Sequence, residues 1–260
     1  MSFGVPHRHY RRTDSTNTRA RELAEAGAPG GTVVTADEQT AGRGRQGRIW
    51  SAPAGKALLY SALLRPLGDR PLLPLAVALA VCDTAEQLAP SAACEIKWPN
   101  DVWIGERKLA GILIETRTQE DWAVIGVGLN LTIAAEEFPA DLRNPAISLF
   151  GSIERGREGS RRSLPAVAPA GPLLTPLTAA TVLSRYLDRW VSAEPQAVLT
   201  AYRERDALAG REISWSDGPN LEQVSGSGVA AGVDDRGGLV VTLASGGSTV
   251  LFAGEVHLRL

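Results

Sequence analysis

The spacing of apolar and polar residues predicts alternating helices and strands along the first third of the chain. A helix is predicted from Ser15, because short polar residues that cap helices precede apolar residues at helical spacing. A β-branched run, residues 32–35, predicts a strand that ends near Asp37. Residues 55–67 predict a second strand, and residues 72–90 are apolar on nearly every side, as in a core helix.

The rest of the chain divides into a strand-rich middle, two helices and a C-terminal set of short strands. The predicted strands of the middle are residues 93–98, 102–105, 108–116 and 122–131. The predicted helices are residues 178–190 and 197–208, and the composition of residues 151–172 predicts an irregular loop. From about Arg211, short strands alternate with glycine turns, as in a small β-barrel. We therefore expect an α+β fold, with a mixed β-sheet flanked by helices in residues 1–208 and a small β domain in residues 209–260.

Composition and charge exclude several classes of protein. The 260 residues carry 27 Lys and Arg against 29 Asp and Glu, so the chain lacks the strong positive field that holds nucleic acid non-specifically. Two cysteines and three histidines are too few for a disulfide framework or a Cys/His zinc site. The sequence has neither a signal peptide nor an apolar run long enough to span a membrane, so we expect a cytoplasmic protein.

The segment GRGRQG, residues 42–47, matches the G-x-G-x-x-G spacing of dinucleotide-binding loops. In such loops the glycines lead into a helix, and an acidic residue follows about 20 positions later. Here Pro53 and Gly55 interrupt the segment where that helix would run, and the end of the next strand carries Arg65 in place of an acid. The sequence therefore predicts that these glycines serve another purpose.

The same loop alternates glycines with arginines and has no acidic residue between Thr40 and Lys56. Glycine allows the backbone to move and to approach a ligand closely, and guanidinium groups bind carboxylates and phosphates. This pattern favours a mobile anion clamp. One alternative is a solvated loop with cationic side chains, and another is an arginine-based nucleic-acid contact, although such contacts usually include aromatic residues. The residues of the clamp are Gly42, Arg43, Gly44, Arg45, Gly47 and Arg48.

Several other polar residues have two interpretations each. Lys97 ends a predicted strand just before the turn at residues 99–101, where side chains commonly reach a ligand, but an exposed strand lysine is the commoner case. Lys108 has the same two interpretations. Residues 15–17 are ordinary capping residues, yet three short polar side chains can also bind a polar ring of a ligand. Gln39, which follows a strand, is equally ambiguous.

Five blocks resemble, in this order, the signature blocks of bacterial biotin–protein ligases. The blocks are DSTN (14–17), EQTAGRGRQGRIW (38–50), KWPND (97–101), KLAGIL (108–113) and GVGLN (126–130). Near the C-terminus, GVAAGVDDRGGLVV (228–241) and GEVHLR (254–259) are similar to the SH3-like domain of that family. The resemblance implies a catalytic domain like that of class II aminoacyl-tRNA synthetases, followed by a small SH3-like β-barrel. Because few residues precede the DSTN block, we expect no N-terminal DNA-binding domain and no repressor function.

The resemblance also implies an activity. Members of the family use ATP and Mg²⁺ to convert biotin to biotinyl-5′-AMP with release of pyrophosphate, and then transfer biotin to a lysine of a biotin carboxyl carrier domain. By position, the catalytic residues are Lys97 and Arg43. The implied biotin-binding residues are Ser15, Thr16, Asn17, Gln39, Arg43, Gly44, Arg45 and Lys97. The implied nucleotide-binding residues are Arg43, Arg45, Trp50, Lys97 and Asn130. A further set implied to line the site comprises Gly42, Lys108, Gly111 and Ile112.

The implied partner is the biotin carboxyl carrier protein of a carboxylase such as acetyl-CoA carboxylase, with no DNA or membrane partner and a monomeric or homodimeric state. The sequence assigns no ligands to Mg²⁺. Two alternatives stay open. One is a lipoate or octanoate ligase or transferase of related fold; the transferase needs a nucleophilic cysteine, and strand alternation points Cys94 away from Lys97. The other is a non-catalytic nucleic-acid-binding module that uses the arginine loop.

Overall fold

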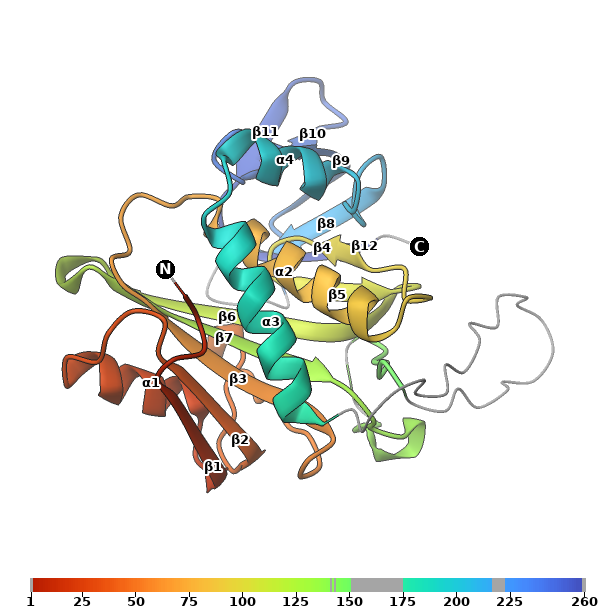
Figure 1. Ribbon diagram of the computed structural model, residues 1–260. Helices are drawn as coiled ribbons and strands as arrows, with labels where there is room; N and C mark the ends of the chain where they lie inside the picture. The colour runs from red at the N-terminus through yellow and green to blue at the C-terminus, as the bar shows by residue number, and fades with distance from the viewer. Residues whose placement is uncertain (1, 141, 143, 151–174, 217–222, 259–260) are drawn as a thin grey trace.

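The computed structural model describes residues 2–140, 142, 144–150, 175–216 and 223–258, which form two β-sheets with helices around the larger one (Figure 1). The strands of the larger sheet are β1 (His7–Thr13), β2 (Val33–Gln39), β3 (Ala57–Leu64), β4 (Glu95–Lys97), β5 (Asp101–Ile104), β6 (Arg107–Arg117) and β7 (Trp122–Asn130). The strands of the C-terminal sheet are β8 (Glu212–Ser216), β9 (Gly226–Val233), β10 (Leu239–Thr242), β11 (Ser248–Leu251) and β12 (Glu255–Leu258). The α-helices are α1 (Thr16–Glu25), α2 (Leu73–Leu88), α3 (Pro176–Val191) and α4 (Pro195–Arg203). The predicted fold class, a mixed sheet with flanking helices and a separate C-terminal β unit, is confirmed.

The large sheet has the order β1-β2-β3-β7-β6-β5-β4. Its first two strands pair in parallel, and its other neighbouring strands pair antiparallel. The sequence prediction missed β1. This strand lies at the edge of the sheet, and most of its side chains are exposed, so its sequence HRHYRRT lacks the apolar alternation by which a half-buried strand is recognised.

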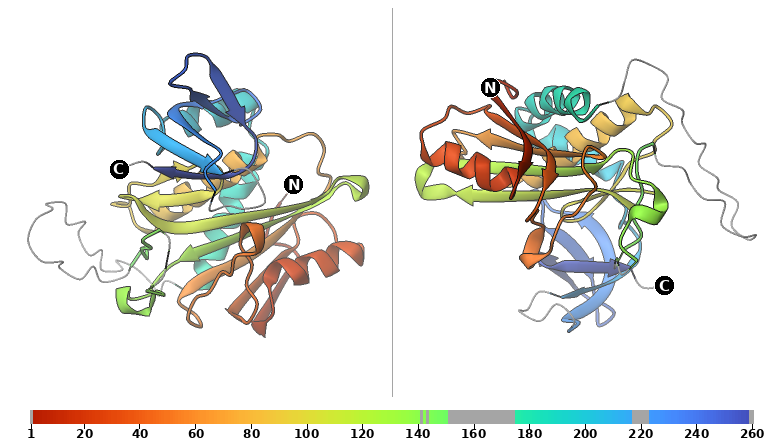
Figure 2. Two further views of the ribbon diagram at one scale, coloured as in Figure 1. Left: turned by 180° about the vertical axis from the view of Figure 1, so that it is seen from behind. Right: turned by 90° about the horizontal axis from the view of Figure 1, so that it is seen from below.

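Helices cover both faces of the large sheet. Val33 belongs to the core cluster that contains α2 and α3, whereas its neighbour Val34 packs with Ala20 and Ala24 of α1. Successive residues of a strand point to opposite faces, so α1 lies on the face opposite α2 and α3. The right-hand view of Figure 2 shows α2 and α3 on one side of the large sheet and the C-terminal sheet on the other. Helix α2 is buried over most of its length, as its all-round apolar sequence predicts.

The C-terminal sheet is antiparallel, with the order β11-β10-β9-β8-β12. Among the described residues its outer strands β11 and β12 do not pair with each other, so the sheet has the form of a small barrel that is not closed, in agreement with the predicted C-terminal β domain. The C-terminal sheet also contacts the large sheet directly. Trp98, which follows β4, donates its indole N–H to the carbonyl oxygen of Gly237 at 3.0 Å.

The segment after α4 differs from its prediction. A helix was predicted over residues 197–208, but α4 ends at Arg203. Asp206 instead forms a parallel bridge with Ile96 of β4, and the Ile96 N–H donates to the carbonyl oxygen of Arg205 at 2.7 Å. These backbone bonds extend the sheet beside β4 and compete with the helix, which sequence periodicity does not reveal. The predicted loop over residues 151–172 lies outside the described residues.

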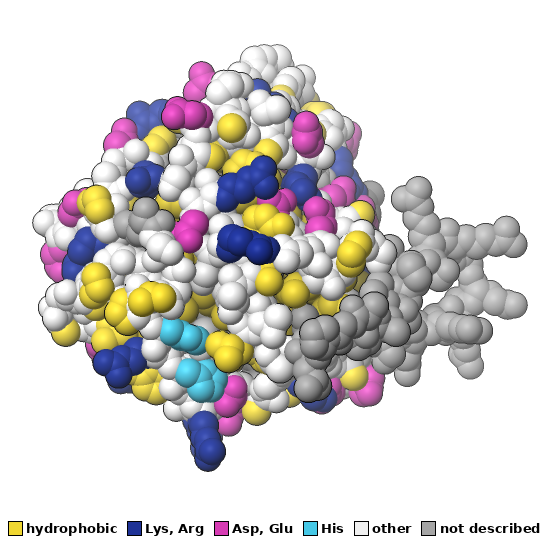
Figure 3. Space-filling model, viewed as in Figure 1, with side chains coloured by type: hydrophobic (Ala, Val, Ile, Leu, Met, Phe, Trp, Pro, Cys, Tyr) yellow, Lys and Arg dark blue, Asp and Glu magenta, His cyan; other side chains and the backbone are white. Residues whose placement is uncertain are grey.

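The charged side chains on the surface are mixed in sign. On the face shown in Figure 3, Lys and Arg lie interspersed with Asp and Glu over the helices that cover the sheet. This distribution agrees with the balanced formal charge of −2. None of the described helices is long and apolar enough to cross a membrane.

Candidate active site

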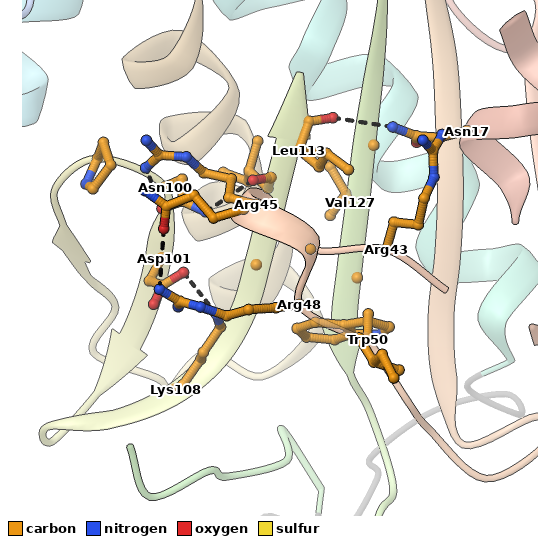
Figure 4. Close-up of a pocket in the computed structure, with 18 of the residues that line it drawn as sticks. Asn17, Arg43, Arg45, Arg48, Trp50, Asn100, Asp101, Lys108, Leu113 and Val127 are labelled. Atoms are coloured by element: carbon orange, nitrogen blue, oxygen red, sulfur yellow. Dashed lines mark hydrogen bonds and ion pairs between the residues drawn. The ribbon is translucent and has the colours of Figure 1, made fainter. Parts of the chain in front are cut away.

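A pocket lies where the large sheet meets the arginine loop and β12 of the C-terminal sheet (Figure 4). It brings together segments that are far apart in the chain: the start of α1, the end of β2, the loop of residues 42–50, β4 to β7, and the start of β12. The pocket therefore depends on both sheets. The residues predicted from the sequence that line it are Ser15, Thr16, Asn17, Gln39, Arg43, Gly44, Arg45, Trp50, Lys97, Lys108, Gly111 and Ile112.

One end of the pocket is built from neutral side chains that hydrogen-bond to one another. Gln39 Oε1 accepts from the Thr16 backbone N–H at 2.7 Å and from the Thr16 hydroxyl at 3.0 Å. Ser61 Oγ lies 2.8 Å from Thr16 Oγ1 and 2.6 Å from Asn17 Oδ1. Ser15 occupies the cap position of α1, but its side chain makes no capping hydrogen bond within the described structure. Capping alone therefore does not explain residues 15–17, because they form one wall of the pocket.

Glu115, near the end of β6, connects this neutral end to the arginine loop. Its Oε2 atom accepts from Asn17 Nδ2 at 2.8 Å and from Arg43 Nη2 at 3.0 Å. The Asn17 amide also donates to the Leu113 carbonyl oxygen at 3.3 Å. The loop is thus tied to the wall of the pocket by a side chain that the sequence analysis did not select.

The other end of the pocket carries two lysines from neighbouring strands. Lys97, the last residue of β4, is 5% exposed, and its ammonium lies 5.0 Å from the centre of the Trp103 ring. Burial lowers the pKa of Lys97 to about 8, and the nearby carboxylate of Asp101 opposes part of this shift. Lys108 of β6 forms an ion pair with Asp101 at 2.8 Å. The alternative interpretation of Lys97 as an exposed strand lysine is therefore wrong.

Two further arginines of the loop contact this cationic end. Arg45 Nη1 donates to Asn100 Oδ1 at 3.1 Å. Burial lowers the pKa of Arg45, and Asp101 opposes this effect. Arg48 pairs with Glu255 of β12, whose side chain is 6% exposed. No helix of the kind that a dinucleotide fingerprint requires follows these glycines, because residues 45–47 form a single 3₁₀ turn.

The floor of the pocket is made by glycines of β6 and β7. A Cβ atom on Gly128 would lie 2.3 Å from Trp50 Cε2, and one on Gly126 would lie 2.2 Å from Asn17 Oδ1. These contacts are too close for a side chain, so the two glycines of GVG allow the indole and the amide to lie directly on the sheet. The ammonium of Lys108 lies 5.7 Å from the centre of the Trp50 ring.

Asn130, Gly42 and Gly47 were predicted from the sequence but do not line the pocket. Asn130 is buried, and its amide donates to the Ile147 carbonyl oxygen at 3.1 Å, so in this structure it supports the segment beside β6. Gly42 lies in the base of the loop, where its carbonyl oxygen accepts from the Trp50 N–H at 2.9 Å. Neither Cys82 nor Cys94 contributes to the pocket lining; both are buried free thiols, as expected for small core side chains.

Several polar residues that hold the site together were not predicted from the sequence, namely Ser61, Asn100, Asp101, Glu115 and Glu255. Asn100 and Asp101 stand inside a quoted motif, so a closer look at its polar positions would have found them. Glu115 gave no local signal, and Glu255 lies in GEVHLR, a block that indicated only the C-terminal domain. Each is one carboxylate on a strand, and only the fold brings them to the arginine loop.

Comparison with known proteins places the chain in a family. The family model for the biotin/lipoate A/B protein ligase family matches residues 9–131. A biotin–[acetyl-CoA-carboxylase] ligase from Mycobacterium tuberculosis is 36% identical over 256 residues, which cover 95% of this chain and 87% of that protein. A bifunctional ligase/repressor from Bacillus spizizenii is 43% identical over 141 residues, which cover 52% of this chain and 43% of the relative, so the match spans less than half of that protein.

The fold agrees with these matches. The structure of a biotin protein ligase from Aquifex aeolicus, in complex with biotin and ATP, superposes with a TM-score of 0.73 at 26% sequence identity. The alignment covers 98% of this chain and 99% of that one. The chain therefore belongs to the biotin/lipoate A/B protein ligase family and, within it, to the biotin protein ligases.

Proposed function

We propose that this protein is an ATP-dependent biotin–protein ligase that forms biotinyl-5′-AMP and transfers the biotinyl group to a lysine of a biotin carboxyl carrier domain. The observation that carries the proposal is the division of one pocket into a neutral hydrogen-bonding end and a cationic end. Biotin has the same division, because a neutral ureido ring and a carboxylate lie at its two ends. The relatives named above support the same activity.

The neutral end would hold the ureido ring. Ser15, Thr16 and Gln39 supply hydroxyl and amide groups that can both donate and accept, as a ureido carbonyl and its two N–H groups require. Asn17 and the glycine floor of β7 would enclose the rest of the bicyclic ring. Because hydrogen bonds already hold these side chains in place, binding of the ring should cost little additional side-chain entropy.

The cationic end would carry the first chemical step. A biotin carboxylate oxygen attacks the α-phosphorus of ATP, the P–O bond to the β-phosphate breaks, and pyrophosphate leaves. The two reacting groups are both anionic, so their repulsion must be offset. Lys97 lies in a nearly solvent-free position, where a charge acts more strongly than in water. Lys108 and the loop residues Arg43 and Arg45 would add to this effect.

We assign the nucleotide to the side of the pocket near Trp50. The Trp50 indole rests on Gly128, and its N–H is a buried donor without a partner among the described side chains and backbone. A buried polar group of this kind favours a ligand that can accept its hydrogen bond. Asn130 would act indirectly, by supporting the backbone beside Lys108.

Mg²⁺ would enter the reaction with ATP. The described carboxylates of the pocket lining, Asp101 and Glu255, pair with Lys108 and Arg48, and Glu115 at its edge pairs with Arg43. Across the described ranges, no three His, Cys, Asp or Glu side chains lie close enough to hold a metal ion. These residues do not fit a resident metal site, so we treat the ion as part of the MgATP substrate, bound through phosphate oxygens.

In the second step, the neutral amine of the acceptor lysine attacks the acyl carbon, and the C–O bond to AMP breaks. One proton must leave the nitrogen as the amide forms. Asp101, 8% exposed and already in contact with Lys108, is one carboxylate at this end that can receive it, and Glu255 is the other. The absence of a cysteine from the described lining argues against the octanoyltransferase mechanism. We place the reaction in the cytoplasm, where ATP and carboxylases are available.

The decisive experiment incubates the purified chain with MgATP and with biotin, lipoate or octanoate in parallel. We expect pyrophosphate release and a biotinyl-AMP mass with biotin, followed by biotinylation of an added carrier domain. Adenylation of lipoate or octanoate without adenylation of biotin would reassign the substrate. Oligonucleotide binding without any pyrophosphate release would instead support the non-catalytic alternative.

A further inference from the structure

Glu115 holds an unusual position for a carboxylate, because it lies at the edge of a pocket lined by five cationic side chains. Its Oε2 atom accepts from Arg43 Nη2 at 3.0 Å and from Asn17 Nδ2 at 2.8 Å. Glu115 itself is not part of the pocket lining, but both of its partners are. The cationic lining residues are Arg43, Arg45, Arg48, Lys97 and Lys108.

The pair with Glu115 separates Arg43 from the other cations. In Figure 4, Arg43 extends toward Asn17 at one end of the pocket, whereas Arg45, Arg48 and Lys108 gather near Asp101 at the other. A guanidinium held in this way has one of its donors committed to a carboxylate of the protein. An anionic ligand that uses the same donor must therefore take it from Glu115.

The exposure of the pair makes such an exchange feasible. The side chains of Arg43 and Glu115 are 38% and 28% exposed. Ion pairs with this degree of solvent contact shift an equilibrium by only about twofold to fivefold, so a ligand carboxylate or phosphate can displace one. The pair between Arg48 and Glu255 differs, because Glu255 is 6% exposed and separating it would leave a buried charge.

The second partner of Glu115 suggests a competing explanation that is purely structural. Asn17 Oδ1 lies 2.6 Å from Ser61 Oγ, which leaves the Asn17 amide N–H directed at Glu115 and Leu113. On this explanation Glu115 only orients Asn17, and its loss would affect every ligand of the neutral end, whether charged or not. The two explanations thus differ in whether the charge of the ligand matters.

We propose that Glu115 is an intramolecular competitor for Arg43, so that its carboxylate lowers the affinity of the pocket for the anionic end of its ligand. This inference rests on the proposed function for the identity of the ligand. Binding of biotin exchanges one carboxylate for another on Arg43, and no covalent bond changes. The competition weakens binding of the free acid. Arg43 stays paired with Glu115 until the anionic end of a ligand has entered the pocket.

The test compares two ligands that differ in charge. Binding of biotin and of biotinamide, in which a neutral amide replaces the carboxylate, is measured by calorimetry for the wild-type chain and for Glu115→Gln. Glutamine keeps an acceptor for Asn17 but removes the charge. We expect Glu115→Gln to tighten biotin about twofold to fivefold at about 0.05 M salt, with a smaller gain at about 1 M salt, and to leave biotinamide unchanged.

Two controls complete the design. Glu106→Gln neutralises a carboxylate in a comparable exposed pair, at 2.7 Å from Arg211 and outside the pocket lining, and it should change neither ligand. In an Arg43→Ala background, Glu115→Gln should give no gain. A gain that persists there would come from the general field of the carboxylate and would overturn the competition.

The remaining outcomes are also decisive. Equal changes for both ligands, or weaker binding of biotin, would show that Glu115 only orients Asn17. No change for either ligand would show that the pair has no influence on the pocket. A wild-type chain that binds neither biotin nor biotinamide would refute the proposed function, and this inference with it, whereas the other results leave that function intact.

Discussion

The two ends of the pocket are built on different physical principles. At the neutral end, Thr16, Asn17, Gln39 and Ser61 satisfy one another through hydrogen bonds and carry no charge. At the cationic end, Lys97 is charged and nearly buried, and its burial opposes the charge that the chemistry needs. The neutral end is stable by itself. At the cationic end the buried charge lowers the folding stability, and a bound anion can offset that loss.

This difference separates recognition from catalysis. Hydrogen bonds between neutral groups change little with salt or pH, so the neutral end should determine which ring is accepted under all conditions. The cationic end should respond to pH, to salt and to the charge of the ligand. A substitution at one end should therefore leave binding at the other end unchanged.

The largest effect should come from Lys97→Met. We expect adenylate formation to fall by about 10²- to 10³-fold, as when one preorganised electrostatic donor is removed from an active site. The lowered pKa of Lys97 also means that its charge is costly, so this variant should be more stable at pH 7, by up to roughly 3 kcal/mol. Pyrophosphate release and denaturant unfolding measure the two quantities. Wild-type turnover in this variant would remove Lys97 from the chemistry.

The next largest effect should come from Thr16→Val at the neutral end. Valine has the same shape but leaves Gln39 and Ser61 with one partner fewer, which typically costs about 1–3 kcal/mol. We therefore expect biotin affinity to fall by about 5- to 150-fold, while ATP affinity stays the same. The matched control is Thr84→Val, since the hydroxyl of this buried threonine of α2 donates to the Ala80 carbonyl oxygen of its own helix and has no other partner among the described residues. Equal losses of ATP and biotin affinity would contradict the independence of the two ends.

The pH dependence should report on the cationic end alone. Lys97 loses its charge as the pH rises through about 8, so biotin affinity should fall above that value, by at most about tenfold per pH unit. The affinity for neutral biotinamide should stay constant over the same range. In Lys97→Met the pH dependence of biotin binding should disappear; if it persists unchanged, another group is responsible.

Folding stability should show the opposite trend in the same range. The folded-state pKa of Lys97, about 8, lies below its ordinary value of 10.5, so the unfolded chain binds more protons between these two values. Stability therefore rises with pH across this window, because the cost of the buried charge disappears. Urea unfolding of the wild type and of Lys97→Met at about pH 7 and about pH 10 would measure this contribution as the difference between the two proteins.

The sequence predicted some residues at each end of the pocket and missed others at each end. The residues of the neutral end lie in or beside compact motifs, so Thr16, Asn17 and Gln39 were selected, and the structure brings all three together. The same is true of Lys97. The prediction failed where a residue acts through a contact that is distant in sequence. Glu115 and Glu255 are 72 and more positions away from the arginines that they bind, and a single carboxylate on a strand has no distinctive local pattern.

The same reason explains the errors in the fold. Strand β1 is an exposed edge strand, so burial left no alternation in its sequence. The helical period of residues 197–208 continues past Arg203, but the backbone there bonds to Ile96 of β4 instead. In both cases the backbone pairs with a strand that is distant in the sequence, and this pairing leaves no local sequence pattern from which it could be predicted.

The smallest effect should come from Glu255→Gln, which tests whether the C-terminal sheet supports the cationic end. Glu255 is buried beside Arg48, so it anchors the loop, in contrast to the half-buried Glu115. Glutamine keeps an acceptor but removes the charge, and charge-assisted hydrogen bonds are about twice as strong as neutral ones, so the loss is about 1 kcal/mol. We expect biotinyl-AMP to dissociate about fivefold faster, with biotinamide binding and the Glu106→Gln control unchanged. Unaltered dissociation of the adenylate would mean that the loop is held by the large sheet alone and that the C-terminal sheet only closes the pocket wall.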